Sequence, residues 1–190
     1  SDPPTAENPE VVVPDTTLNV SLGAPIKGTT LYRTGKESPL MTLRFEAQYE
    51  DVYVTGLSLE DVYGKDIVDS KLHLDVIEYE HVYDQEFDDI EYYASSTPHL
   101  GHIAFQTLVN NRIHVPVGKS KEVYIALRDV GKLQRKYQGK KLQLILDIND
   151  IKAVSYITEE PVNIRSLTEN TILQSEEFIL RNEPPPKETP

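Results

Sequence analysis

The sequence predicts an all-β protein, because three features of the chain are typical of strands and tight turns. Short runs alternate between apolar and polar side chains, which is the pattern of a strand with one buried face. Val, Ile, Thr and Tyr recur throughout the 190 residues, with 11 Tyr in all, and these side chains suit a pleated surface. Gly, Pro, Asn and Asp separate the runs, as they do at turns. Two antiparallel sheets packed face to face as a sandwich, with about seven to nine strands, would bury one face of every run.

Each run places its apolar residues on one side of an expected strand. The residues expected to face inward are Leu18, Val20 and Leu22; Leu43, Phe45 and Ala47; Val52, Val54, Leu57 and Leu59; Leu72, Leu74 and Val76; Ile103, Phe105 and Leu108; Val123, Ile125 and Leu127; Leu142, Leu144, Leu146 and Ile148; and Ile172, Phe178 and Leu180. Burial of one Leu or Phe contributes roughly 1.5–3 kcal/mol. These positions together supply the drive to fold that disulfides supply in smaller secreted domains.

We expect one sandwich domain over residues 16–182, with an arm before it and a tail after it. Residues 1–15 are rich in Pro and acidic side chains and are expected to form an extended N-terminal arm. Residues 183–190 read EPPPKETP and are expected to form a Pro-rich, polyproline-like tail. Within the domain, the acidic segment 79–93 has no clean period and is expected to be a long loop or an irregular edge. Residues 130–137 are expected to form one short helical turn.

The composition argues against several classes of function. The chain has 19 Lys and Arg against 31 Asp and Glu, and its net charge of −12 repels nucleic acid and anionic lipid. No apolar run approaches the roughly 18 residues of a membrane-spanning helix, so we expect no membrane insertion. The absence of Cys excludes a disulfide framework and thiolate chemistry, and it favours an exported protein. An extracellular or cell-surface location is therefore expected.

Several stretches, in this order, are similar to a known family. They are 18–22 (LNVSL), 43–48 (LRFEAQ), 50–57 (EDVYVTGL), 103–108 (IAFQTL), 113–120 (IHVPVGKS), 124–130 (YIALRDV), 151–154 (IKAV) and 175–184 (SEEFILRNEP). Through them the chain resembles the immunoglobulin-like sandwich domains of surface and S-layer-like proteins from bacteria of the candidate phyla radiation. The resemblance implies an extracellular sandwich with a structural or adhesive role, and it carries over no active-site residues. The single sandwich and the acidic segment 79–93 depart from the family pattern.

Two clusters have side chains that bind metals. Asp84, Glu86, Asp88 and Asp89 form a cluster of oxygen ligands, and calcium takes about six to eight oxygens from such loops. The alternative for this cluster is a solvated acidic loop that keeps a sheet edge from pairing wrongly. His99 and His102 offer two imidazoles, but a zinc site needs three or four ligands. Two exposed loop histidines are the alternative there, so calcium is the one ion proposed and no other cofactor is expected.

Two further patterns suggest a role for sugars. Tyr79, Tyr83, Tyr92 and Tyr93 would stack on sugar rings if they formed an exposed patch, although tyrosines also pack along sheet edges. Asn19 opens the glycosylation sequon Asn-Val-Ser within an expected strand. No nucleophile elbow and no phosphate-binding Gly loop is recognisable, and no carboxylate pair stands out. We therefore expect a protein that is not an enzyme.

The expected N-terminal arm suggests the first expected function, which is assembly of copies of the chain. Val11, Val12 and Val13 form an apolar island in the polar arm, suited to strand addition on a neighbouring subunit. A head-to-tail contact of this kind builds a filament or an S-layer-like lattice from copies of the chain. The alternative is that the arm folds back on its own domain, which costs less entropy. The second expectation for function is an adhesin or surface module that binds a glycan or a protein, either alone or with calcium.

Overall fold

The computed structural model describes residues 15–26, 30–32, 37–64, 73–83, 86–128 and 138–181. Of these, residues 30–32, 80–83 and 86–89 are described by their backbone alone. The expected arm, the tail and the short turn at 130–137 lie outside the described residues, apart from Asp15. In the described part of the chain, no helix is long and apolar enough to cross a membrane.

The protein is all-β, as the alternating runs predicted. The strands are β1 (Thr17–Leu22), β2 (Thr30–Tyr32), β3 (Ser38–Gln48), β4 (Val52–Gly56), β5 (Ser58–Asp61), β6 (Leu74–Tyr83), β7 (Glu86–Ser96), β8 (His102–Ala104), β9 (Ile113–Val115), β10 (Ser120–Leu127), β11 (Lys141–Leu142), β12 (Leu144–Asp147), β13 (Lys152–Ser155), β14 (Asn163–Ser166), β15 (Ile172–Gln174) and β16 (Phe178–Arg181). The 3-10 helices η2 (Gln106–Val109) and η4 (Ile148–Asp150) lie between strands.

One layer is a six-stranded sheet in the order β14-β1-β3-β10-β6-β7. β3 lies in the middle of this sheet and pairs antiparallel with both β1 and β10. Its residue Phe45 lies opposite Val20 of β1. The pair formed by β1 and β14 is parallel. Leu43, Phe45 and Ala47 alternate with more polar residues along β3 and are all buried, because only one face of the strand meets the core.

The second layer consists of two short sheets, β13-β4-β9 and β15-β12-β5-β8. β4 and β5 belong to one apolar run that is interrupted at Leu57. β12 and β13 are separated by η4, where the Asp147 side chain accepts a hydrogen bond from the Asn149 backbone N–H at 3.0 Å. The prediction of seven to nine strands was therefore too low, because such interruptions divide the expected runs into the sixteen strands described.

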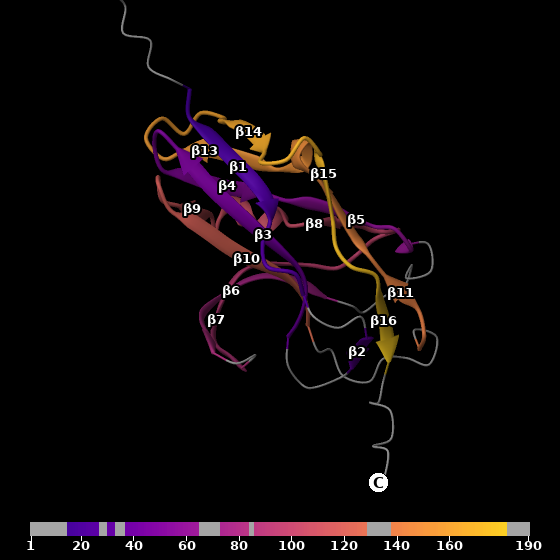
Figure 1. Ribbon diagram of the computed structural model, residues 1–190. Coiled ribbons are helices and arrows are strands. Elements are labelled where there is room, and N and C mark those ends of the chain that lie inside the picture. The colour runs from indigo at the N-terminus through magenta and orange to yellow at the C-terminus, as the bar shows by residue number, and fades with distance from the viewer. Residues whose placement is uncertain are drawn as a thin grey trace, which may run out of the picture.

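A fourth sheet, β11-β16-β2, lies at the opposite end of the molecule from β9 and β13 (Figure 1). Between the layers lies one continuous apolar core, to which strands of all the sheets contribute. The alternation predicted most of this core correctly, including Phe45, Phe105 and Phe178, which are at most 1% exposed. Leu22 and Ile172 were assigned to the core wrongly, since they are 44% and 39% exposed at the ends of short strands.

The acidic segment 79–93 is not a loop. It forms most of the β6–β7 hairpin, in which Glu78 pairs with Glu91 and β7 lies at the edge of the six-stranded sheet. The expectation of an irregular edge is confirmed, because the register of the hairpin shifts between Val76 and Ile77. The two strands form although the sequence here lacks a clean apolar period, because their backbones pair along most of the hairpin.

Candidate functional site

The expected calcium cluster cannot be followed in the structure. Asp84 and the side chains of Glu86, Asp88 and Asp89 lie outside the described residues, so calcium binding there stays a prediction. Within the described part of the chain, no group of three or more His, Cys, Asp or Glu side chains could hold a metal ion. His99 and His102 close a tight turn through two backbone hydrogen bonds of 2.9 Å, and both residues are exposed.

Among the tyrosines expected to form a sugar platform, the Tyr83 side chain lies outside the described residues, and two of the other three are buried. Tyr79 and Tyr93 are each only 7% exposed, whereas Tyr92 is 49% exposed. Tyr79 packs edge-to-face on Tyr124 at a centroid distance of 4.8 Å. The Tyr93 hydroxyl donates a hydrogen bond to Glu78 at 2.6 Å. The Tyr79 and Tyr93 rings therefore pack within the sheet and leave little surface for a sugar.

Asn19, the sequon residue, lies in the interior of the six-stranded sheet. It is 7% exposed, and it pairs with Glu46 on one side and Arg165 on the other. Little of the Asn19 residue is open to solvent in the folded chain, and glycosylation there stays a prediction.

The structure brings together three turns at one end of the molecule, which we call the tip. They are the β3–β4 turn at residues 49–51, the β9–β10 turn at 116–119 and the β13–β14 turn at 156–162. Asp51 joins all three turns. Its side chain accepts a hydrogen bond from the Val117 backbone N–H at 2.8 Å, and its carbonyl accepts one from the Tyr156 N–H at 3.0 Å.

The outer surface of the β13-β4-β9 sheet carries three aromatic rings next to the tip. Val52 and Val54 face the core, so Tyr53 between them faces outward, and the same alternation turns His114 outward from β9. The ring centroid of Tyr53 lies 5.4 Å from that of His114 and 5.2 Å from that of Tyr156. The His114 and Tyr156 centroids are 5.7 Å apart, which closes the triangle.

Charged side chains hold this aromatic cluster in place. The Arg112 guanidinium lies 5.5 Å from the centroid of the Tyr53 ring and donates two hydrogen bonds to Glu159, at 2.8 and 2.7 Å. His114 Nε2 lies 2.7 Å from Asp51 Oδ2. The hydrogen bonds from Val117 and His114 lower the pKa of the Asp51 carboxyl below its usual value. We call Tyr53, Arg112, His114, Tyr156 and Glu159 the aromatic face.

A polar cleft of about 440 Å³ opens beside the aromatic face. We call it the tip cleft, and its lining residues are Asp15, Thr16, Glu50, Ser155, Thr158, Glu160, Pro161, Val162 and Asn163. The cleft and the aromatic face share the β13–β14 turn, because Tyr156 lies between Ser155 and Thr158. Glu50 of the cleft also precedes Asp51, the partner of His114. Tyr156 is 50% exposed and Ile157 is 75% exposed on the same turn.

Sequence reasoning missed the aromatic face. A signal was present in Val52-Tyr53-Val54 and Ile113-His114-Val115, where a ring stands between two inward-facing aliphatic residues. The convergence of these rings was not visible, because Tyr53, His114 and Tyr156 come from strands and turns far apart in the chain. Only the pairing of β4 with both β9 and β13 brings them together.

Comparisons with known proteins give distant structural likenesses only. No protein family and no curated protein matches the chain. The fold is similar to AvmM, described as catalysing macrocyclisation in alchivemycin A biosynthesis, with a TM-score of 0.39 and 11% identity over 91% of this chain and 92% of that one. It is also similar to Spo0M, a sporulation control protein from Bacillus subtilis, with a TM-score of 0.28 and 7% identity. That match covers 90% of this chain but about half, 51%, of Spo0M.

Proposed function

We propose that this chain is an immunoglobulin-like binding module of an extracellular surface, an adhesin that takes a glycan at the tip. The observation that carries the proposal is the position of the aromatic face, with Tyr156 50% exposed, beside the tip cleft. The cleft falls within the range of roughly 300–1,000 Å³ that is usual for small-ligand sites.

The chemistry of the two surfaces is complementary to a sugar. The apolar face of a sugar ring packs on an aromatic ring, and Tyr156 offers such a ring at 50% exposure. Sugar hydroxyls both donate and accept hydrogen bonds. The carboxylate of Glu160 accepts from such groups, and Thr158 and Asn163 both donate and accept. The polar lining of the cleft favours a hydroxyl-rich ligand over the apolar centre of a protein interface.

Removal of the Tyr156 ring should weaken glycan binding at least about tenfold, because central aromatic residues contribute more than about 1.4 kcal/mol at binding sites. The measurement is titration calorimetry on the oligosaccharide that binds best in a glycan array, with wild type compared with Tyr156→Ala and Tyr53→Ala. Tyr92→Ala is the matched control, because Tyr92 is about as exposed as Tyr156, at 49%, but lies on β7 and not at the tip. Wild-type affinity in both tip variants, or an array without any bound glycan, would contradict the proposal.

We propose a filament or S-layer-like subunit as the second candidate function. Asp15, the first described residue, lines the tip cleft, so residues 1–14 join the described chain at the tip. Strand addition by Val11–Val13 would then begin beside β1, close to the edge strand β14 of the six-stranded sheet.

Deletion of residues 1–14 should leave a folded monomer that no longer assembles, because the added strand is lost while the core stays intact. Electron microscopy and light scattering of purified protein would measure assembly, and circular dichroism would confirm the fold. A point variant, Val12→Asp, tests the apolar island within the full-length chain. Filaments that form equally well from the deleted chain would rule out strand addition by this segment.

A further inference from the structure

The tip cleft is acidic as well as polar. Its lining includes the carboxyl groups of Asp15, Glu50 and Glu160, and none of the described residues that line it is a Lys, Arg or His. The three carboxyl groups come from separate parts of the chain, namely the approach to β1, the β3–β4 turn and the β13–β14 turn. The fold therefore brings acidic side chains to one recess, which a neutral ligand alone does not require.

These carboxyl groups are not balanced by a cation within the described part of the chain. The side chains of Asp15 and Glu160 are exposed, and neither makes a hydrogen bond or an ion pair with another described residue. Glu50 is half-buried, and its carboxyl group accepts a hydrogen bond of 2.5 Å from the neutral hydroxyl of Thr16. A positively charged ligand would supply the missing partner.

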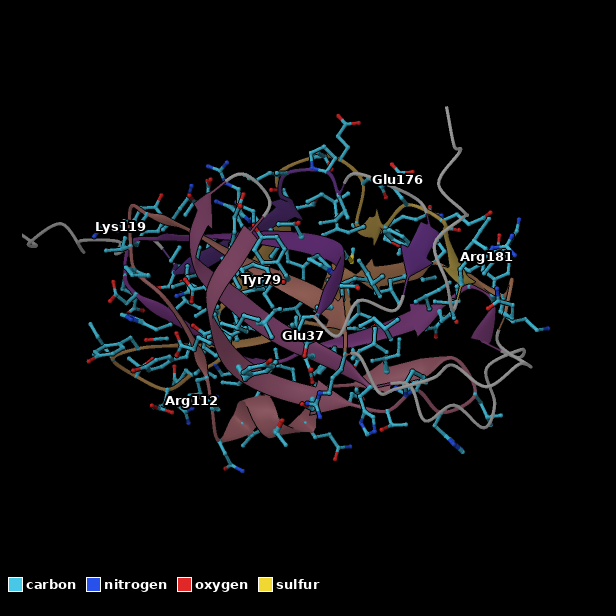
Figure 2. The ribbon with its side chains drawn as sticks, turned by 90° about the horizontal axis from the view of Figure 1, so that it is seen from below. Glu37, Tyr79, Arg112, Lys119, Glu176 and Arg181 are labelled. Carbon is cyan, nitrogen blue, oxygen red and sulfur yellow. The ribbon has the colours of Figure 1, made fainter. Side chains whose placement is uncertain are left out.

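The basic side chains of the tip lie outside the cleft. Arg112 is paired with Glu159 at 2.7 Å, and His114 Nε2 lies 2.7 Å from Asp51. Lys119 belongs to the β9–β10 turn and does not line the cleft. Figure 2 shows Arg112 and Lys119 toward the same end of the molecule. A cationic ligand in the cleft therefore does not have to displace any of these side chains.

We propose that the glycan bound at the tip carries free amino groups, so that the ligand class is an oligosaccharide of amino sugars. This inference rests on the proposed function, because it takes the tip cleft and Tyr156 as the sugar site. A protonated amine has three N–H donors, and its hydrogen bonds to carboxylates are among the stronger ones in proteins. The ring of one sugar packs on Tyr156, and its ammonium group is also attracted by the face of a tyrosine ring.

The spacing of the carboxyl groups favours an extended ligand over a bare metal ion. A calcium ion takes about six to eight oxygens that converge on one point. In the part of the chain that the structure describes, no group of three or more acidic or His side chains is close enough to hold a metal ion. The carboxyl groups are instead spread along a cleft of about 440 Å³, which suits a chain of sugars with an amine on each unit.

The test is titration calorimetry on the full chain with two probes that differ only in acetylation of their amines. One probe is the β-1,4-linked hexamer of glucosamine, and the other is the same hexamer of N-acetylglucosamine. The amine form should bind at least about tenfold more tightly at low salt, because hydrogen bonds between charged groups contribute that much to affinity. This preference should shrink in about 0.5 M sodium chloride, which screens exposed charges.

Two variants test the carboxyl groups themselves. Glu160→Gln and Asp15→Asn each retain the shape of the side chain and remove its charge. Each should reduce the preference for the amine hexamer, and the double variant should abolish it, with an unchanged affinity for the acetylated hexamer. Glu176→Gln is the matched control, because Glu176 is also an exposed glutamate but does not line the tip cleft. It should keep the full preference, and circular dichroism would confirm that all variants fold.

Three results would overturn the amino-sugar inference. Equal affinity for the two hexamers, or an equal loss of preference in Glu176→Gln, would do so and would leave the glycan site itself standing. Tighter binding of hexalysine than of the amine hexamer would assign the cleft to a basic peptide. If neither hexamer binds, the inference fails, and the glycan array decides separately whether the proposed function fails with it.

Discussion

The Phe45→Ala variant is expected to lose about 3–5 kcal/mol of unfolding free energy, the range for a large ring removed from a close-packed core. Phe45 lies on the central strand β3, is 0% exposed, and belongs to the core that both layers share. Truncation leaves a cavity that the sheet cannot close, because its hydrogen bonds to β1 and β10 fix the position of the backbone. A loss of this size is a large part of the roughly 5–15 kcal/mol that stabilises a typical domain.

Urea denaturation followed by far-ultraviolet circular dichroism would measure this loss, since the chain has no Trp for fluorescence. Phe45→Leu is the matched variant and should lose less, because Leu fills much of the ring volume. Ile157→Ala is a surface control, as Ile157 is 75% exposed and should change stability by at most about 0.5 kcal/mol. A loss below about 1 kcal/mol in Phe45→Ala would contradict the burial of this ring.

The Arg128→Leu variant should lose about 3 kcal/mol, because it leaves Asp75 buried without its cation. This value is at the lower end of the range for broken buried pairs, since the Arg128 side chain is itself 40% exposed. Asp75 is fully buried at 0% exposure, and Arg128 donates two hydrogen bonds to its carboxylate at 2.8 and 2.6 Å.

Two variants separate the charge of Arg128 from its bulk. Arg128→Lys retains the charge but not the two-pronged hydrogen bond, and it should lie between wild type and Arg128→Leu. Arg165→Leu removes an exposed arginine of β14 and should leave the urea midpoint nearly unchanged. Equal midpoints for Arg128→Leu and Arg165→Leu would show that the buried carboxylate does not depend on this arginine.

The local pattern of the chain was enough to predict the class of fold and most of the core. Phe45, Val54 and Leu144 are buried because alternation along a strand is a local property, readable from neighbouring residues. The same reasoning failed for Ile172, the first residue of the short edge strand β15, because burial also depends on what covers a residue. The β6–β7 hairpin was not predicted as two strands for a related reason. Pairing between the two strands stabilises it, although its apolar residues do not alternate cleanly along the chain.

The candidate sites depended on contacts between residues that are distant in sequence. The aromatic face requires β4 to pair with both β9 and β13, and the buried ion pair joins Asp75 of β6 to Arg128 after β10. The sequence by itself determined which residues face inward, because side-chain alternation follows from the geometry of a single strand. Only the tertiary structure decided which outward side chains meet and which carboxyl group is buried beside an arginine, because these depend on strand order and register.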